Sequence, residues 1–185
     1  MQRSKSNGFL FWPILLAVVA SDIATKWLAV EKLSDPQGMP HEVFGEYVRF
    51  TLVYNPGAAF GLNVGDADTS RWVFTALTIG ALLILGRLYT STRPGDRTRM
   101  LALALVCGGA LGNLIDRIRH SRGVVDFLDI GFGDARWPTF NIADMAVSSG
   151  AFLLAIVLWA EDRAEGDAKV GLVPTELRHE STEAT

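Results

Sequence analysis

Cysteine and histidine are scarce in this sequence, and their scarcity excludes several kinds of site. Cys107 is the one cysteine in 185 residues, so neither a disulfide framework nor a cysteine-rich metal site can form within the chain. The three histidines, His41, His120 and His179, lack the spacing of metal ligands, and we expect no metal and no cofactor. Cys107 lies inside an apolar run, which predicts a small buried side chain.

The charge balance gives no general basic field that would attract nucleic acid. The formal net charge is −3 at pH 7. The chain has no run of lysine and arginine and no alternation of basic with aromatic residues, so we expect no nucleic-acid partner.

Apolar residues, in contrast, make up 49% of the chain, and the mean hydropathy is +0.25. They gather in four stretches, each close to the roughly twenty residues that a helix needs to cross a hydrocarbon core of about 30 Å. The predicted spans are residues 9–30, 71–90, 99–118 and 140–159. Because the length suits one domain and no repeat occurs, residues 1–160 are predicted to form one integral-membrane domain. Residues 161–185 are charged and are predicted to form a disordered cytoplasmic tail.

The first span has features of a secretory signal peptide. Arg3 and Lys5 precede a short apolar core, and small residues precede Ser21. The apolar pattern resumes after Asp22, however, and continues to Val30, and three further spans follow. We therefore expect a retained membrane helix rather than a cleaved peptide.

The charges of the loops predict the orientation of the chain. Arg3 and Lys5 precede the first span, and four arginines crowd the link between the second and third spans. By the positive-inside rule, both segments belong in the cytoplasm. The 31–70 loop carries six acidic residues against two basic ones and is predicted to lie outside. The 119–139 loop, with three arginines, fits the rule less well, but four spans with both termini in the cytoplasm are expected.

Two segments outside the spans have the pattern of strands. Residues 47–54 alternate polar and apolar side chains and end at the turn signal Asn55-Pro-Gly57. Pro56 also biases Asn55 toward an extended backbone. Residues 124–130 and 135–137, on either side of a glycine-containing turn, have the pattern of a second hairpin. We expect a small sheet on the outer surface of the membrane.

The unusual polar residues all map to the outer side of this topology. Ionisable groups at membrane depth are costly and usually face a partner or a water-filled cavity, so they mark a candidate functional site. The residues are Asp22, Lys26, Asn55, Asn113, Asp116, Arg117, Asp126, Asn141 and Asp144.

Asp126 and Asp144 are the predicted catalytic pair. Two carboxyl groups that approach closely cannot both ionise, so the pair holds one proton between them. The ionised member can take a proton from water, while the protonated member donates to a carbonyl oxygen and then assists departure of an amine. Such a pair suits hydrolysis of an amide bond. Which aspartate holds the proton is open at this point.

Each of these residues also has a structural interpretation. Asp144 could merely favour the N-terminus of the last span through the helix dipole, and Asp126 could be an ordinary turn residue. Gly108 and Gly112, spaced as Gly-xxx-Gly, are predicted to let another helix approach closely.

Two charged pairs have structural interpretations as well. Asp116 and Arg117 could be charge partners that position the helix end. Asp22 and Lys26, four residues apart, could form an interfacial pair in which the lysine reaches toward the headgroups.

Two other classes of protein compete with a hydrolase. A transporter or proton-relay subunit would also carry charged residues inside the membrane, but it would distribute them across the membrane's depth. Four spans without broken or repeated halves also argue against a transporter. A structural scaffold, whose charges only lock helices together, would tolerate replacement of Asp126.

Five motifs occur in order over roughly residues 10–160. They are Asp22-xxx-Lys26, Tyr54-Asn-Pro-Gly-Ala-Ala-Phe60, Gly109-xx-Gly112-Asn-xx-Asp-Arg117, Val124-Val-Asp126-Phe and Phe140-Asn-xx-Asp144. Together they resemble the lipoprotein signal peptidases, the signal peptidase II family. Pro56 stands where that family more often has a small polar residue.

The resemblance implies a membrane all-α fold with four transmembrane helices and a small extracytoplasmic β-sheet. It implies an aspartyl endopeptidase of the bacterial inner membrane that cleaves prolipoproteins just before the diacylglyceryl-modified cysteine. The expected partners are these precursors, membrane lipid and globomycin-type inhibitors, and the family needs no metal.

The family's catalytic aspartates match Asp126 and Asp144. Its polar support matches Asp22, Lys26, Asn55, Asn113, Arg117 and Asn141. To these we add Gly57 and Asp116 as positioning residues.

Overall fold

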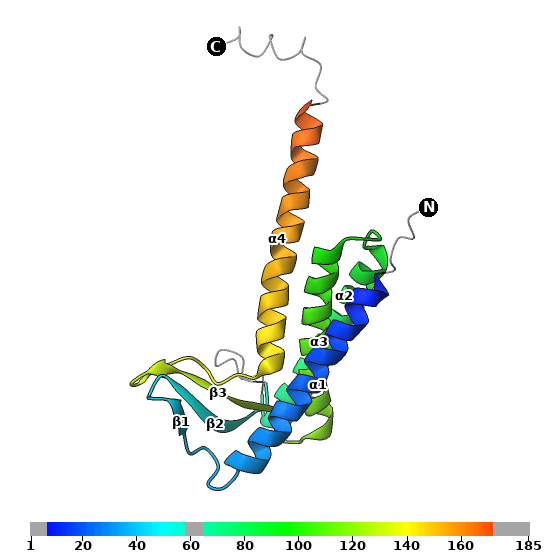
Figure 1. The fold of residues 1–185 in the computed structure, drawn as a ribbon. Coiled ribbons are helices and arrows are strands. Elements are labelled where there is room, and N and C mark those ends of the chain that lie inside the picture. The colour runs from blue at the N-terminus through cyan, green and yellow to red at the C-terminus, as the bar shows by residue number, and fades with distance from the viewer. Residues whose placement is uncertain (1–6, 58–64, 172–185) are drawn as a thin grey trace.

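Four long helices form a bundle that carries a small sheet at one end (Figure 1). The computed structural model describes residues 7–57 and 65–171. Within these ranges the helices are α1 (Gly8–Leu33), α2 (Ala67–Ser91), α3 (Arg97–Arg119) and α4 (Ile142–Gly171). The strands are β1 (His41–Phe44), β2 (Val48–Asn55), β3 (Val124–Phe132) and β4 (Ala135–Arg136).

All four helices of the described ranges are long and apolar enough to cross a membrane. Large apolar side chains remain exposed on their outer surfaces, among them Trp12, Leu83 and Phe152. Water would disfavour such exposure, whereas lipid tails are as apolar as these side chains. The predicted membrane fold of four spanning helices with a small sheet is confirmed.

Acidic caps determine where two of the helices begin. Asp66 accepts a hydrogen bond from the Thr69 amide at 2.7 Å, so α2 begins at Ala67 rather than at the predicted residue 71. The hydrogen bonds from Thr69 also lower the pKa of the Asp66 carboxyl below its ordinary value. Asp96 caps α3 in the same way through the Arg99 amide at 3.0 Å.

Helix α4 continues well past residue 159, the predicted end of its span, and projects beyond the other helices (Figure 1). The chain stays helical to Gly171, so residues 161–171 form a helix where the sequence predicts disorder. Residues 161–171 contain two alanines, two glutamates, one arginine and one lysine, which favour helices, beside two glycines and two aspartates, which do not. Glu161 is also paired with Arg99 at 2.7 Å. The rest of the predicted tail, residues 172–185, lies outside the described residues, as do Arg3 and Lys5.

The sheet is antiparallel throughout, in the order β1-β2-β3-β4. The predicted strand at 47–54 is β2, and the predicted hairpin after residue 124 is β3 with β4. Strand β1 was not predicted, because four exposed residues are too short to show an alternating pattern. Asn55 ends β2 in an extended conformation, as Pro56 predicts, and Val53, two residues before it, pairs with Asp126 on β3.

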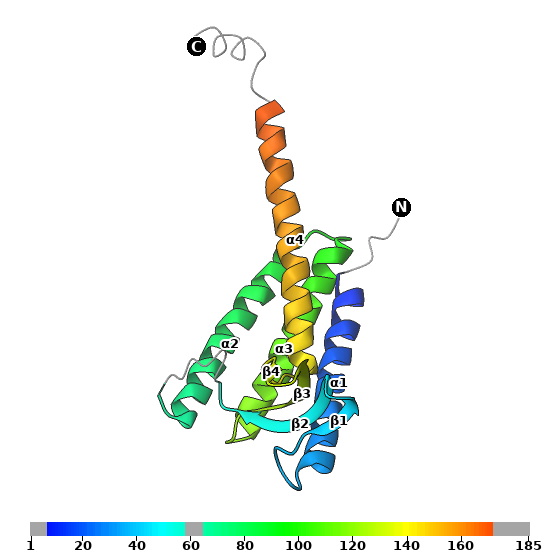
Figure 2. The ribbon, with the colours of Figure 1, turned by 90° about the vertical axis from the view of Figure 1, so that its left-hand side faces the viewer.

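Helix α3 is central, and α1, α2 and α4 all pack against it (Figure 2). Glycines permit this close approach. A Cβ on Gly109 would lie 2.3 Å from the Ala143 carbonyl oxygen of α4, and one on Gly112 would lie 2.5 Å from Asp22 Oδ2 of α1. A Cβ on Gly108 would lie 2.9 Å from a side chain of α1. The predicted packing role of Gly108 and Gly112 is confirmed.

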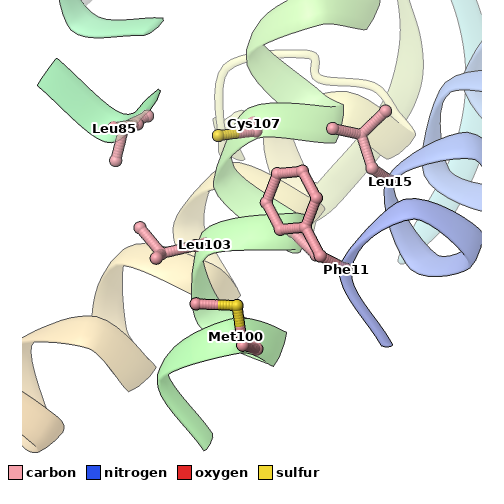
Figure 3. Close-up of a cluster of buried hydrophobic side chains, with 7 residues drawn as sticks. Phe11, Leu15, Leu85, Met100, Leu103 and Cys107 are labelled. Carbon is pink, nitrogen blue, oxygen red and sulfur yellow. The ribbon is translucent and has the colours of Figure 1, made fainter. Parts of the chain in front are cut away.

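Two apolar clusters hold the bundle and the sheet together. The first joins α1, α2 and α3 away from the sheet and comprises Phe11, Leu15, Leu85, Met100, Leu103, Ala104 and Cys107 (Figure 3). Cys107 is therefore buried, as predicted. The second joins the end of α1 to β2 and β3 and comprises Ala29, Leu33, Leu52, Val125 and Phe127. Along α1, the polar residues Asp22 and Lys26 lie between these two clusters.

Candidate active site

A buried lysine organises the polar residues at the sheet end of the bundle. Lys26 Nζ lies 2.7 Å from Asp22 Oδ2 and 2.9 Å from Asp116 Oδ2. It also donates to Asn113 Oδ1 at 2.9 Å. The Lys26 side chain is only 4% exposed, so the expectation that it reaches toward the headgroups is wrong. Three acceptors replace water around the ammonium, and such pairing is what makes a buried charge tolerable.

The two aspartates beside Lys26 connect it to neighbouring elements. Asp22 Oδ1 accepts from the Ala143 amide in the first turn of α4 at 2.9 Å. Asp116 Oδ2 accepts from the Val125 amide at the start of β3 at 3.1 Å. Asp116 thus forms its ion pair with Lys26, and its interaction with Arg117 is a longer-range electrostatic one.

Two buried asparagines link this cluster to the predicted catalytic pair. Asn113 Nδ2 donates to Asp144 Oδ1 at 2.8 Å, and Asn113 Oδ1 accepts from Asn141 Nδ2 at 3.1 Å. Asn141 Nδ2 also donates to Asp126 Oδ1 at 2.7 Å. A continuous hydrogen-bonded path therefore runs from Lys26 to both aspartates.

Asn141 and Asp144 also cap helix α4. Asn141 Oδ1 accepts from the Asp144 amide at 2.9 Å, and Asp144 Oδ2 accepts from the Asn141 amide at 3.1 Å. This reciprocal pair explains why α4 begins at Ile142 rather than at residue 140. The structural interpretation of Asp144 as a residue that favours the helix start is confirmed.

Asp126 lies on β3 and is only 2% exposed, so it is not a turn residue. Its Oδ2 accepts from Asn55 Nδ2 at 3.2 Å. Burial, and then the charge of Asp144, raise the pKa of the Asp126 carboxyl to about 7. A carboxyl with this pKa can hold a proton at neutral pH, as a general acid must.

The end of β2 is fitted closely against α2. The Gly57 amide donates to Asn55 Oδ1 at 2.9 Å, which leaves the Asn55 amide nitrogen to face Asp126. Gly57 has φ +123°, and a Cβ there would lie 2.3 Å from a ring carbon of Phe74. Both its backbone conformation and its contact with Phe74 require glycine.

Arg117 stands apart from the other predicted residues. Its guanidinium lies 5.9 Å from the Phe74 ring centroid and makes a long contact of 3.4 Å with the Asn113 carbonyl oxygen. Arg117 Nε is buried without a hydrogen-bond partner among the residues described. The backbone carbonyl of Arg117 accepts from Arg71 Nη1 at 3.1 Å, and Arg71 also pairs with Asp68 at 3.2 Å.

Sequence reasoning missed Arg71 and Phe74. The signal for Arg71 was a charged residue at the start of an apolar span, three positions after Asp68. Nothing in the sequence distinguishes Phe74 from the other aromatic residues of the spans, so it could not be predicted as a site residue.

The structure brings all the predicted site residues to one end of the bundle, where α1, α3, α4, β2 and β3 meet. Their roles in catalysis stay a prediction. Across residues 7–57 and 65–171, no group of three or more His, Cys, Asp and Glu side chains is placed to hold a metal ion. What the geometry offers is a protonatable buried carboxyl beside a second, partly exposed one, and this arrangement can supply acid and base together.

Known proteins are similar to this chain in sequence and in fold. Residues 14–160 match the family described as signal peptidase (SPase) II. A lipoprotein signal peptidase of Burkholderia thailandensis is 43% identical over 155 residues, which cover 82% of this chain and 90% of the relative. One of Polynucleobacter necessarius is 38% identical over 151 residues, covering 81% of this chain and 87% of the relative. The solved structure of a bacterial membrane enzyme aligns with a TM-score of 0.69 at 31% identity, covering 80% of this chain and 87% of that chain.

The family match spans most of the chain, and the curated relatives are similar over nearly their whole length. The family resemblance of the five motifs is confirmed. This chain belongs to the signal peptidase II family and is a membrane endopeptidase of the aspartic type.

Proposed function

We propose that this peptidase removes the signal peptide of prolipoproteins, cleaving N-terminal to the diacylglyceryl-modified cysteine, with Asp126 and Asp144 as the pair that activates water. The observation that carries the proposal is the position of Asn141. Its amide nitrogen donates to Asp126, while its backbone and side-chain oxygen hold Asp144 through the helix cap. One residue thus holds both carboxyl groups in the same site. The names of the relatives support a lipoprotein precursor as the substrate.

The proposed reaction transfers protons in two steps. First, the ionised carboxylate takes a proton from water as the water oxygen bonds to the scissile carbonyl carbon, and the protonated carboxyl gives its proton to the carbonyl oxygen. A neutral tetrahedral diol results. In the second step, the newly protonated carboxyl gives its proton to the amide nitrogen as the carbon–nitrogen bond breaks. The other carboxylate takes a proton from a diol hydroxyl, which releases a carboxylic acid and an amine and restores the pair.

The proposed location is the bacterial inner membrane, with the site at its extracytoplasmic surface. Helix α1 begins and α4 ends at the end of the bundle opposite the sheet (Figure 1). The same end carries the arginines of the link between α2 and α3: Arg87, Arg93, Arg97 and Arg99. By the positive-inside rule, these arginines support a cytoplasmic location for this end, and with it the proposal that the sheet and the site lie outside.

The proposed route of the substrate lies between α2 and α4. Both helices pack against α3, but their backbones do not approach one another in the described part of the chain. Figure 2 shows α2 leaning away from α4 toward the sheet end. The acyl chains of a lipid-modified substrate could therefore stay in lipid while the peptide reaches Asp126 and Asp144. A lipid-free peptide should be cleaved much more slowly than the modified one.

The competing interpretations predict different arrangements. A proton relay needs ionisable groups across the depth of the membrane, whereas Asp22, Lys26, Asp116 and Asp144 gather at one end of the helices. A scaffold would keep its function when Asp126 is replaced by asparagine.

The test is cleavage of a purified diacylglyceryl-modified prolipoprotein, with the product identified by mass spectrometry. Asp126→Asn and Asp144→Asn should each lose at least about a hundredfold in rate, because each removes one of the two proton-transfer groups. Asp134→Asn is the matched control, since Asp134 is exposed in the turn between β3 and β4. A globomycin-type cyclic peptide should block cleavage by the wild type.

Thermal unfolding in detergent must show that each variant is folded. If either aspartate variant cleaves at nearly the wild-type rate, the two-carboxylate mechanism is wrong. If the product does not begin with the modified cysteine, the proposed cleavage position is wrong.

A further inference from the structure

Asp126 and Asp144 lie in different surroundings, although each accepts two hydrogen bonds. Asp126 is buried on a strand, and both of its donors are neutral side-chain amides, from Asn55 and Asn141. Asp144 is only partly buried and is the third residue of α4. Burial in apolar surroundings favours the neutral form of a carboxyl group. The deeper burial of Asp126 therefore already favours its protonated form over that of Asp144.

Helix α4 adds a second difference. Asp144 Oδ2 accepts from the backbone amide of Asn141 at the N-terminus of the helix. The first turn of a helix carries partial positive charge, which stabilises an anion there. Asp126, on its strand, receives no such contribution.

A third difference comes from Lys26. The Lys26 ammonium donates to Asn113 Oδ1 at 2.9 Å, and Asn113 Nδ2 donates to Asp144 Oδ1 at 2.8 Å. An amide whose oxygen is bound by a cation is polarised, so its N–H groups become stronger donors. Through this polarised amide, Lys26 stabilises the ionised form of Asp144. Asn141, which also donates to Asn113 Oδ1, receives no donation from the lysine itself.

We propose that Lys26, acting through Asn113, is a positioning residue that keeps Asp144 ionised, so that Asp144 is the base and Asp126 carries the shared proton as the acid. The inference rests on the proposed function of these two aspartates as the catalytic pair. The raised pKa of Asp126, about 7, agrees with this assignment.

The other charged groups near the pair do not reverse the assignment. Asp22 and Asp116 share the charge of Lys26, but each also accepts from a backbone amide, so their own charge is partly compensated. Arg117 interacts electrostatically with both members of the pair and has no direct ion pair with either. Its interaction with Asp144 is larger than that with Asp126, so it supports the same assignment. Lys26 also stabilises the charged form of Asp126 electrostatically, but burial and the charge of Asp144 outweigh this effect.

The first test needs no substrate. Aspartate labelled with carbon-13 at the carboxyl carbon is incorporated into the whole protein, and the resonances are assigned from the Asp126→Asn and Asp144→Asn variants. We expect the chemical shift of the Asp126 carboxyl carbon to titrate near neutral pH. The Asp144 carbon should keep the chemical shift of a carboxylate over the same range. Titration of Asp144 near neutrality, with Asp126 ionised, would overturn the proposal. This result stands apart from cleavage, so a failure of the proposed function is distinguished from a failure of the assignment.

The second test asks whether Lys26 acts through Asn113. The acid limb of the pH profile of kcat/KM reports the pH at which the pair first ionises. Lys26→Met and Asn113→Leu should each move this limb by about one unit or more to higher pH, because the anion loses its support. Lys26→Arg, which keeps the charge, should leave the limb near its wild-type position. Lys32→Met is the matched control, since Lys32 is exposed near the end of the same helix.

Lys26→Met leaves Asp22 and Asp116 without their cation and can fail to fold. Asn113→Leu keeps that ion cluster intact, so it tests the proposal by itself. A folded Asn113→Leu variant whose acid limb coincides with that of the wild type would contradict the role given to Lys26.

Discussion

Arg71 is joined to Arg117 by a hydrogen bond of 3.1 Å from its guanidinium to the Arg117 backbone carbonyl oxygen. The same guanidinium pairs with Asp68 in the first turn of α2. Among the helices of the described chain, the α2 backbone approaches only α3. This bond therefore holds the start of α2, including Phe74, beside the candidate site.

Replacing Arg71 should loosen that connection. Arg71→Ala should lower the free energy of unfolding by about 1–3 kcal/mol, since the Arg117 carbonyl loses a charged donor. It should also raise KM more than it lowers kcat. The start of α2, which lies beside the site, would move, while Asp126 and Asp144 would stay in place. Kinetics and thermal unfolding in detergent measure both effects. Arg87→Ala, at the exposed far end of the same helix, is the control, and equal behaviour of the two variants would contradict the prediction.

Gly112 should not tolerate a methyl group. Because a Cβ would lie 2.5 Å from Asp22 Oδ2, Gly112→Ala must displace the aspartate from Lys26 or push the helices apart. We expect a loss of about 1–3 kcal/mol in stability and a strong loss of cleavage activity. Gly86→Ala is the matched control, since nothing lies within 4 Å of a Cβ there, and it should be neutral or slightly stabilising. A Gly112→Ala variant as active and stable as Gly86→Ala would show that this contact is unimportant.

The stability of the protein should fall as pH rises past the ordinary pKa of aspartate, through the contribution of Asp126. Between an unfolded pKa near 3.8 and a folded pKa of about 7, the folded state holds a proton that the unfolded state has released. Stability is therefore lost with rising pH in this window, by an amount on the order of 4 kcal/mol for a fully buried group. Asp126→Asn should remove this slope. The measurement is the thermal transition of both proteins from pH 4 to pH 8, and parallel curves would disprove the assignment.

Asn141 has two tasks that substitution can separate. Serine is a good N-cap but lacks the amide donors, so Asn141→Ser should keep most of the helix stability while cleavage falls sharply. Asn141→Ala should lose the cap too, at a cost of about 1 kcal/mol relative to serine. Thermal unfolding and cleavage rates distinguish the two effects. If the serine variant cleaves like the wild type, the bond from Asn141 to Asp126 is dispensable.

The spans could be predicted because membrane thickness imposes a length on apolar helices, and no tertiary contact alters that requirement. Their ends could not be placed as well. Asp66 and Asn141 cap helices at positions where hydropathy gives no sharp boundary. Helix α4 extends past Glu161 although the apolar stretch ends there, and hydropathy carries no information about the helicity of a polar segment.

Helical spacing predicted which polar residues share a face, but it did not predict their partners. Asp116 and Arg117 are neighbours in sequence, yet Asp116 bonds to Lys26 and Arg117 lies against Phe74. The direction of a long side chain depends on elements that are distant in the sequence. Lys26 illustrates this dependence, since an isolated helix would send it to the surface, and its burial requires acceptors from α3 in addition to Asp22 of its own helix.

The order of the elements along the chain has a consequence for biosynthesis. Asp126 lies on a strand between the last two helices, and Asp144 lies at the start of α4, which follows every other described element. While the earlier helices are being inserted into the membrane, the nascent chain has the Lys26 cluster only in part, because Ala143 also contributes to it. If the two aspartates act as proposed, proteolytic competence arises in a single late event, when α4 docks against α3.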